Sequence, residues 1–285
     1  MTAANGFNRD ASGAGLAWLR RSAANVAAAF MMLVRPVRVH ARPPWAPPVH
    51  KLAIGAAVAT AIFLIGMLFV DAAASNAAKR LPTWLVSFFD EITDFGKSGW
   101  FLWPLGILFL ALAALPHSRL SRMSQGVLAA VMVRVGFLFV AIGAPSLFVT
   151  IVKRMIGRAR PALSGVVDPT LFSPFKWTAA YAGMPSGHAT TAFAVLAAVG
   201  TLWPRARTIV LIYALLIAVS RVVVIAHYPT DVLAGALVGI VGVLMVRRWF
   251  ALRRLGFAVG PDGLLHQYPG PSIRRIKKVA RELLA

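Results

Sequence analysis

Long apolar blocks are the feature that most restricts how this chain can fold. Six of them lie at 52–70, 100–115, 127–152, 189–203, 208–226 and 231–246. A helix needs about 20 apolar residues to cross the hydrocarbon layer of a bilayer, and only helices and closed barrels satisfy their backbone polar groups there. The sequence therefore predicts an all-α integral membrane protein, a bundle of six transmembrane helices. Three blocks are short by this rule, so five or seven spans are the alternatives.

Basic residues are unevenly distributed over the segments between the blocks. An even number of crossings puts both termini on one side, which holds 20 Lys and Arg residues against 8 on the other. By the positive-inside rule, both termini face the cytoplasm. The predicted order is a basic cytoplasmic N-terminal segment (1–51), a six-helix core in the cell (inner) membrane (52–246) and a basic cytoplasmic C-terminal tail (247–285). We interpret the basic tails as surfaces for anionic lipids; partly disordered tails are the alternative.

A further helix is predicted between the first two blocks. In the segment 80–95, apolar residues recur at three- and four-residue steps, which is the helical period. We expect this helix to lie in the outer membrane interface. A helix that simply packs on the bundle is the alternative.

The net charge of +21 restricts the partners of the chain. Such an excess of basic residues is typical of proteins that bind nucleic acid, anionic lipid or an anionic substrate. The apolar blocks make nucleic acid the least suitable of these partners. The chain has no cysteine, which excludes disulfides, zinc–thiolate sites and thiol catalysis. The sequence predicts no oligomeric state.

Three polar clusters stand apart from the apolar background, at 153–161, 185–188 and 220–231. In the six-helix topology all three lie at the outer end of the bundle. Cations in a partly desolvated cavity require an anion, and arginine side chains match phosphate oxygens in two-point contacts. Ser186 and Gly187 begin a helix, whose free N–H groups favour an anion. The cations that we expect in this cavity are Lys153, Arg160 and Arg221.

Two histidines, His188 and His227, lie at the outer ends of the blocks. Asp231 follows His227 at the spacing of one helical turn, so we expect its carboxylate to accept a hydrogen bond from one ring nitrogen. The other nitrogen is then free to attack phosphorus. His188 protonates the departing alkoxide and later activates water.

Carboxylates are too few for a catalytic metal. Between residues 94 and 262 the only acids are Asp168 and Asp231, whereas magnesium, manganese and paired-zinc sites need several carboxylates. We therefore expect neither a metal nor another cofactor, and we assign Asp168 no role. Arg154 and Arg158 are interpreted as contacts to lipid headgroups.

The three clusters match the pattern Lys-x6-Arg-Pro, Pro-Ser-Gly-His and Ser-Arg-x5-His-x3-Asp without departure and in that order. The chain thus resembles the type-2 phosphatidic acid phosphatase and vanadium haloperoxidase superfamily, in its membrane lipid phosphatase branch. The resemblance implies that His227 is the covalent nucleophile, Asp231 its partner and His188 the acid and base. The phosphate ligands that it implies are Lys153, Arg160, Ser186, Gly187 and Arg221.

The expected function is a metal-independent membrane phosphatase with a phosphohistidine intermediate on the outer face of the membrane. Candidate substrates are phosphatidic acid, phosphatidylglycerol phosphate, an isoprenyl pyrophosphate and lipid A. A lipid phosphotransferase that uses the same intermediate is the alternative. A protein that binds or transports anionic lipid is the non-enzymatic alternative. A haloperoxidase fits less well, since those enzymes need vanadate and are usually soluble.

Overall fold

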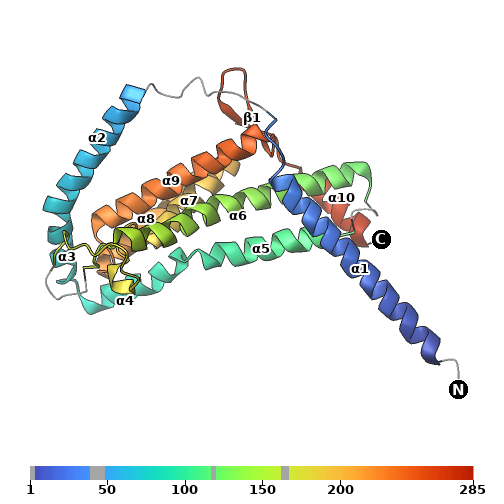
Figure 1. Ribbon diagram of the computed structural model, residues 1–285, viewed down its shortest axis with the longest axis horizontal. Coiled ribbons are helices and arrows are strands. Elements are labelled where there is room, and N and C mark those ends of the chain that lie inside the picture. Colours follow the sequence, from blue (N-terminus) through green and yellow to red (C-terminus); the bar gives the residue numbers. More distant parts are fainter. Residues whose placement is uncertain (1–3, 39–48, 117–119, 162–166, 285) are drawn as a thin grey trace. The chain divides into compact units, whose positions relative to one another are not determined.

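The computed structural model describes residues 4–38, 49–116, 120–161 and 167–284 (Figure 1). Two short strands, β1 (Phe257–Val259) and β2 (Leu265–Gln267), pair antiparallel. The helices in chain order are α1 (Ala4–Leu33), α2 (Val49–Ile65), η1 (Gly66–Val70), α3 (Asp71–Ala78), α4 (Thr83–Thr93), η2 (Asp94–Gly96), α5 (Gly99–Ala114), α6 (Arg122–Ile156), η4 (Ala179–Tyr181), α7 (Gly187–Leu202), η5 (Pro204–Ala206), α8 (Arg207–Val223), α9 (Pro229–Leu252) and α10 (Ile273–Leu284).

Five helical stretches of the described residues are long and apolar enough to cross a membrane. The fourth predicted block forms α7, which is apolar but has only 16 residues. At a rise of 1.5 Å per residue it spans about 24 Å, less than the hydrocarbon layer of about 30 Å. The prediction of a helical, multi-pass membrane protein is confirmed, whereas the count of six crossings stays a prediction. The five stretches are Ala53–Ala78, Thr83–Ala114, Arg122–Ile156, Pro204–Val223 and Pro229–Leu252.

The first apolar block continues as a helix beyond its predicted end. α2 passes through the π-helical turn η1 directly into α3, which ends at Ala78. The predicted apolar block ended at residue 70, so a segment outside the membrane was expected from position 71 onward. Instead, Asp71 begins α3 and is completely buried. A buried carboxylate in an apolar helical stretch requires a cationic or hydrogen-bonding partner.

α4 occupies the segment that was predicted to be an amphipathic helix, and it packs against α8. Its last residue, Thr93, is buried and contacts the end of α8 through its hydroxyl group. This packing positions α4 beside the third polar cluster. Its location in the membrane interface stays a prediction.

Two glycines of α9 allow α7 to pack against it at very short distance. A Cβ atom on Gly235 would lie 2.4 Å from the carbonyl oxygen of Ser186, and one on Gly239 would lie 2.5 Å from that of Thr190. Small residues at this four-residue spacing are common where membrane helices pack closely. As a result, the N–H of Ser186 donates to the carbonyl oxygen of Asp231 at 2.9 Å, which joins the second and third clusters.

The chain forms two compact units. One comprises the described residues of 42–103 and 138–249 and contains every site residue predicted from the sequence. α7 and α8 lie side by side within it (Figure 1). The other unit comprises the described residues of 1–41, 104–137 and 250–285. This unit contains α1 from the basic N-terminal segment, and the β1–β2 hairpin and α10 from the basic C-terminal tail. The sequence prediction for these tails was based on charge alone.

Candidate active site

The first polar cluster lies where α6 ends. Lys153 is in the last turn of this helix. Gly157 follows the helix with a φ of +66°, and a Cβ atom there would lie 1.9 Å from the carbonyl oxygen of Ser173, so only glycine fits. The backbone N–H of Arg160 then donates to the carbonyl oxygen of Ala180 at 2.9 Å. Lys153 and Arg160 therefore lie on either side of a helix end.

The second cluster forms the N-terminus of α7. Ser186 is the N-cap residue, but its side chain makes no capping hydrogen bond, and its Oγ is buried without a hydrogen-bond partner. A Cβ atom on Gly187 would meet no other atom within 4 Å. The free N–H groups of the first helical turn thus border an open space. Together with the Ser186 hydroxyl, they are suited to bind an oxyanion.

The third cluster begins at the end of α8. Nη1 of Arg221 donates to Oγ1 of Thr93 at 2.6 Å, whereas Nε of Arg221 is buried without a partner. The chain then turns through Ile225, whose φ of +53° is strained for a β-branched residue. The N–H groups of Ala226 and His227 both donate to the carbonyl oxygen of Arg221 at 3.1 Å. This turn holds His227 close to the end of α8.

His227 is 3% exposed and is hydrogen-bonded to the backbone. Its Nδ1 donates to the carbonyl oxygen of Gly183 at 2.7 Å and lies 3.7 Å from Oδ2 of Asp231. The predicted hydrogen bond to Asp231 is not formed, because α9 begins at Pro229 and His227 precedes the helix. A carbonyl group only accepts, so the proton is on Nδ1. Nε2 has no hydrogen-bond partner among the described residues, and burial lowers the pKa of the ring.

Arg158 holds the Asp231 carboxylate. Its side chain is completely buried, with Nη1 2.6 Å from Oδ1 of Asp231 and Nη2 2.7 Å from Oδ2 of Asp71. Its Nε and Nη2 donate to the carbonyl oxygen of Pro169 at 3.0 and 2.9 Å. The guanidinium carbon lies 4.5 Å from the centre of the Tyr228 ring. The interpretation of Arg158 as a headgroup contact is wrong, and Asp71, to which the sequence analysis gave no role, is a second carboxylate beside Asp231.

Asp71 also holds the start of α9. The N–H of Thr230 donates to Oδ1 of Asp71 at 3.0 Å, and the Thr230 hydroxyl donates to Oδ2. Nη1 of Arg158 donates to the same hydroxyl at 2.7 Å. Two carboxylates share one guanidinium in this network, which leaves a formal charge of about −1 close to His227. Such a charge stabilises a positively charged imidazole ring.

His188 is in the first turn of α7 and packs against η2. A Cβ atom on Gly96 would lie 2.9 Å from Cδ2 of the His188 ring. Ser186, two residues before His188, donates its N–H to the carbonyl oxygen of Asp231, four residues after His227, at 2.9 Å. The structure therefore places both predicted histidines at the same end of the helices, with the N-terminus of α7 between the other clusters.

The site carries more positive charge than its own side chains neutralise. No carboxylate in the described part of the chain forms an ion pair with Lys153 or Arg160. Burial lowers the pKa of Arg160, because the guanidinium is partly removed from water. A buried donor without an acceptor costs about 1–3 kcal/mol. An oxyanion would satisfy the three such donors found here, which are Nε of Arg160, Nε of Arg221 and Oγ of Ser186.

Four partners in this site were not predicted from the sequence. Asp71 offered a usable signal, since a carboxylate at the end of an apolar block requires a partner. Arg158 is a basic residue of the first cluster, so it was a candidate for the cationic partner that Asp71 requires. The carbonyl group of Gly183 and the hydroxyl group of Thr93 gave no signal in the sequence, because a glycine or a threonine is not unusual in these segments.

The fold and the site together define a helical membrane protein with a cationic, partly buried cluster of side chains that includes two histidines and is suited to an oxyanion. A family model described as the PAP2 superfamily matches residues 134–255, which include every site residue predicted from the sequence. The chain belongs to this superfamily.

Two curated relatives are lipid A 1-phosphatases. That of Rhizobium johnstonii is 33% identical over 202 residues, which cover 70% of this chain and 81% of the relative. That of Rhizobium etli is 32% identical over 200 residues, which cover 70% and 85%. A solved structure, the first transmembrane PAP2 type phosphatidylglycerolphosphate phosphatase from Bacillus subtilis, is 23% identical with a TM-score of 0.48 and covers 71% of this chain and 94% of that chain. The predicted class, a membrane lipid phosphatase, is confirmed by the family and the curated relatives.

Proposed function

We propose that the chain removes the phosphate group of a lipid through a phosphohistidine intermediate on His227, without a metal ion or other cofactor. Nε2 of His227 attacks phosphorus, the bond from phosphorus to the ester oxygen breaks, and His188 gives its proton to the departing oxygen. His188 then takes a proton from a water molecule, which attacks phosphorus and breaks the phosphorus–nitrogen bond. Inorganic phosphate leaves, and both histidines return to their initial protonation states.

The observation that carries this proposal is a set of three buried donors without hydrogen-bond partners, one from each cluster: Nε of Arg160, Oγ of Ser186 and Nε of Arg221. Ser186 is the N-cap residue of α7, next to the open space at Gly187, and Nε2 of His227 has no partner among the described residues. Donors that are fixed before the reaction stabilise the charge on the transferred phosphoryl group. The proposed phosphate ligands are Lys153, Arg160, Ser186, Gly187 and Arg221.

Asp231 has a different part in this proposal from the one expected from the sequence. Its carboxylate is 3.7 Å from Nδ1 of His227 and is held by Arg158. The Gly183 carbonyl orients the ring, and the net negative charge shared by Asp231, Arg158 and Asp71 stabilises the imidazolium in the intermediate. Both carboxylates are already bound to Arg158 and are therefore not free to hold a metal ion. This supports a mechanism in which side-chain cations stabilise the phosphate.

For the substrate, the curated relatives favour one of the four candidates. Both act as lipid A 1-phosphatases, so we propose the phosphate of a lipid A-type glycolipid as the first substrate to test. Phosphatidic acid, phosphatidylglycerol phosphate and an isoprenyl pyrophosphate are the comparison substrates.

For the location, we propose that α7 completes a six-span bundle and that both termini face the cytoplasm. The site then lies at the outer face of the cell (inner) membrane, where a lipid headgroup is accessible. The excess of Lys and Arg on the side of the termini supports this orientation. In this arrangement α4 lies at the outer interface, and the basic tails contact anionic lipids.

The experiment is a phosphate-release assay of the purified protein with the four lipids, with EDTA and vanadate as additions. We expect release with lipid A, inhibition by vanadate and no effect of EDTA. His227→Ala abolishes release, whereas His266→Ala, a change of an exposed histidine in the hairpin, does not. His188→Ala should also abolish phosphate release, since both the departure of the ester oxygen and the hydrolysis of the intermediate lose their proton donor and acceptor.

Three results would separate the alternatives. Phosphate found on a sugar or lipid hydroxyl group, in place of free phosphate, would identify a phosphotransferase. Lipid binding that persists in His227→Ala without any turnover of the wild type would identify a binding or transport protein. Loss of activity in EDTA would overturn the metal-independent mechanism.

A further inference from the structure

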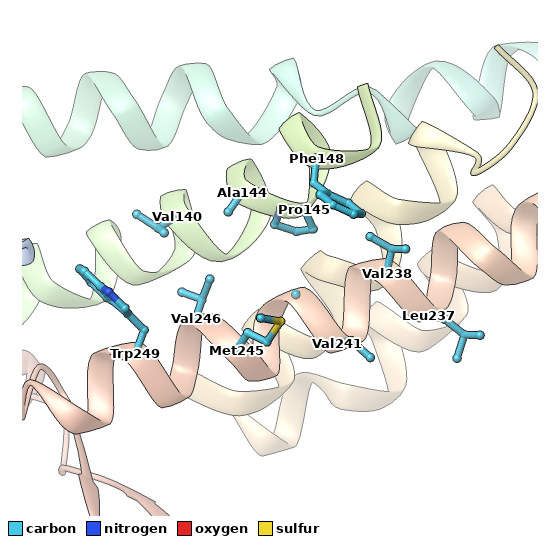
Figure 2. A pocket seen from close by; sticks show the side chains of 11 residues that line it. Val140, Ala144, Pro145, Phe148, Leu237, Val238, Val241, Met245, Val246 and Trp249 are labelled. Atoms are coloured by element: carbon cyan, nitrogen blue, oxygen red, sulfur yellow. The ribbon is translucent and has the colours of Figure 1, made fainter. Parts of the chain in front are cut away.

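An apolar groove of about 750 Å³ lies between α6 and α9 (Figure 2). Ala144, Pro145 and Phe148 line it from α6, and Val241 and Met245 line it from α9. Every lining residue is apolar. Phe148 and Met245 are 53% and 67% exposed, so the groove is open along its side. It therefore opens to the surroundings of the helices, which are lipid in a membrane protein.

A glycine sets the depth of this groove. A Cβ atom on Gly242 of α9 would lie 2.8 Å from Cβ of Pro145 in α6. The two helices touch at this point, where only a residue without a side chain fits. The contact closes the floor of the groove and leaves its length open along both helices.

The groove and the oxyanion site are connected through α7. The hydroxyl oxygen of Ser146, the residue after Pro145, lies 3.3 Å from that of Thr191. The Thr191 hydroxyl donates to the carbonyl oxygen of Gly187 at 3.1 Å. Gly187 borders the oxyanion site, and one helical turn of about 5.4 Å separates it from Thr191. The floor of the groove therefore begins roughly one helical turn from the proposed phosphate position.

The groove begins within one leaflet's depth of the site and continues past the middle of the hydrocarbon layer. On α9 it extends from Leu237 to Trp249, which is about 18 Å at the rise of an α-helix. Half of the hydrocarbon layer is about 15 Å thick. Asp231 precedes Leu237 on the same helix by about 9 Å. The groove therefore covers about 9 to 27 Å from the site, and only its near end lies within the depth of one leaflet. An acyl chain that extends from the site enters the groove at this near end.

We propose that this groove binds one acyl chain of the lipid whose phosphate lies in the site. The inference rests on the proposed function, since the phosphate site is the anchor of the lipid. The groove alone has no polar group that selects a headgroup. Lys153 follows the groove residue Phe148 by five positions on α6, about 7.5 Å along the helix. Among the described residues neither Lys153 nor Arg160 has a carboxylate partner, so both favour a lipid with an anionic phosphate. The occupant is therefore the substrate lipid, in preference to a neutral bilayer lipid or a protein helix.

The first experiment measures binding and does not depend on turnover. The full-length protein in micelles is labelled with phosphatidic acid that carries a photoreactive diazirine in the middle of one acyl chain, and the labelled residues are mapped. We expect labels on the groove residues of α6 and α9, at least fivefold reduced by Ala144→Trp, which fills the groove. Leu147→Trp changes an exposed residue of α6 outside the groove and leaves labelling unchanged. Val241→Trp fills the groove from the other helix and serves if Ala144→Trp fails to fold.

Competition identifies the occupant. Excess lipid A reduces the labelling at least fivefold, whereas phosphatidylcholine with the same acyl chains does not. Equal competition by phosphatidylcholine would show a groove for any bilayer lipid and would overturn the inference. Labels outside the groove would overturn it as well, and so would labelling that depends on protein concentration and joins two copies of the chain.

The second experiment compares hydrolysis of lipid A with hydrolysis of the same disaccharide phosphate after complete removal of its acyl chains. We expect Ala144→Trp to lower kcat/KM at least tenfold for lipid A and to leave kcat/KM for the deacylated compound unchanged. An equal decrease for both compounds would contradict acyl-chain binding. If the wild type hydrolyses neither compound, the proposed function fails, and the labelling experiment still decides the occupant of the groove.

Discussion

Removal of Arg158 tests whether its buried ion pairs hold the site together. In Arg158→Met, a side chain of similar length loses the guanidinium group and leaves two carboxylates without their shared cation. Asp71 and Asp231 are both completely buried, so water does not replace the lost partner. The variant also frees the carbonyl oxygen of Pro169, which accepts two hydrogen bonds from Arg158.

The expected cost follows from this burial. Removing one partner of a buried ion pair destabilises a protein by about 3–5 kcal/mol, whereas an exposed ion pair contributes about 0–1 kcal/mol. We therefore expect Arg158→Met to lower the free energy of unfolding by about 3–5 kcal/mol. Activity decreases too, because the Asp231 carboxylate and the start of α9 lose their anchor. Arg158→Met combined with Asp71→Asn should be less unstable than Arg158→Met alone, since one buried charge is removed.

The assay is denaturant-induced unfolding in detergent micelles, with phosphate release measured on the same preparations. Arg154→Met is the matched control. Arg154 comes from the same cluster, but its hydrogen bond to the Trp177 carbonyl oxygen is exposed, so we expect a change within about 0.5 kcal/mol. A loss below about 1 kcal/mol in Arg158→Met, or equal losses in both variants, would refute the argument that Arg158 is a buried structural cation.

Three further predictions concern the helix N-terminus, the packing of α7 and the nucleophile. Ser186→Ala removes a hydroxyl group that makes no capping bond, so we expect unchanged thermal stability and about tenfold weaker inhibition by vanadate; a marked loss of stability would show a structural role. Gly239→Ala places a Cβ atom 2.5 Å from the carbonyl oxygen of Thr190, so we expect at least a tenfold loss of phosphate release. Gly126→Ala, at a position with no atom within 4 Å of the new Cβ, keeps normal release; equal effects would rule out a packing role. Burial lowers the pKa of His227 in the folded chain. At a pH below the ordinary histidine pKa of about 6.5, the unfolded chain therefore takes up a proton on this ring, whereas the folded chain does not. The stability of the wild type relative to His227→Asn should therefore be constant above that value and fall as the pH is lowered from 7.5 to 5; a difference in thermal midpoint that stays constant would contradict a buried neutral ring.

The sequence predicted the chemistry of the site better than its contacts. The three clusters do converge, and Arg160, Arg221 and Ser186 each present a buried donor without a partner. The predicted bond from His227 to Asp231 is wrong, because helical spacing applies only when both residues are in the helix. Here α9 begins at Pro229, between them.

The fold, too, was predicted in part from the sequence. The lengths of the apolar blocks predicted the helices, since a bilayer requires apolar segments of a given length whatever their neighbours are. They did not predict that α2 continues through η1 into α3, because a polar residue normally ends an apolar block. Asp71 is tolerated inside the protein because Arg158 lies 2.7 Å from it and Thr230 donates two hydrogen bonds to it.

The sequence by itself determined that the chain is a helical membrane protein with three cationic clusters and two histidines near them, because hydrophobicity, charge and residue type are properties of each segment. Only the tertiary structure decided which cation is neutralised by carboxylates and which keeps a donor without a partner. Arg158 and Asp71 are 87 residues apart in the chain, and ion pairing depends on distance in space. Arg158 is bound on both sides, whereas Arg160, two positions further along, keeps a donor free.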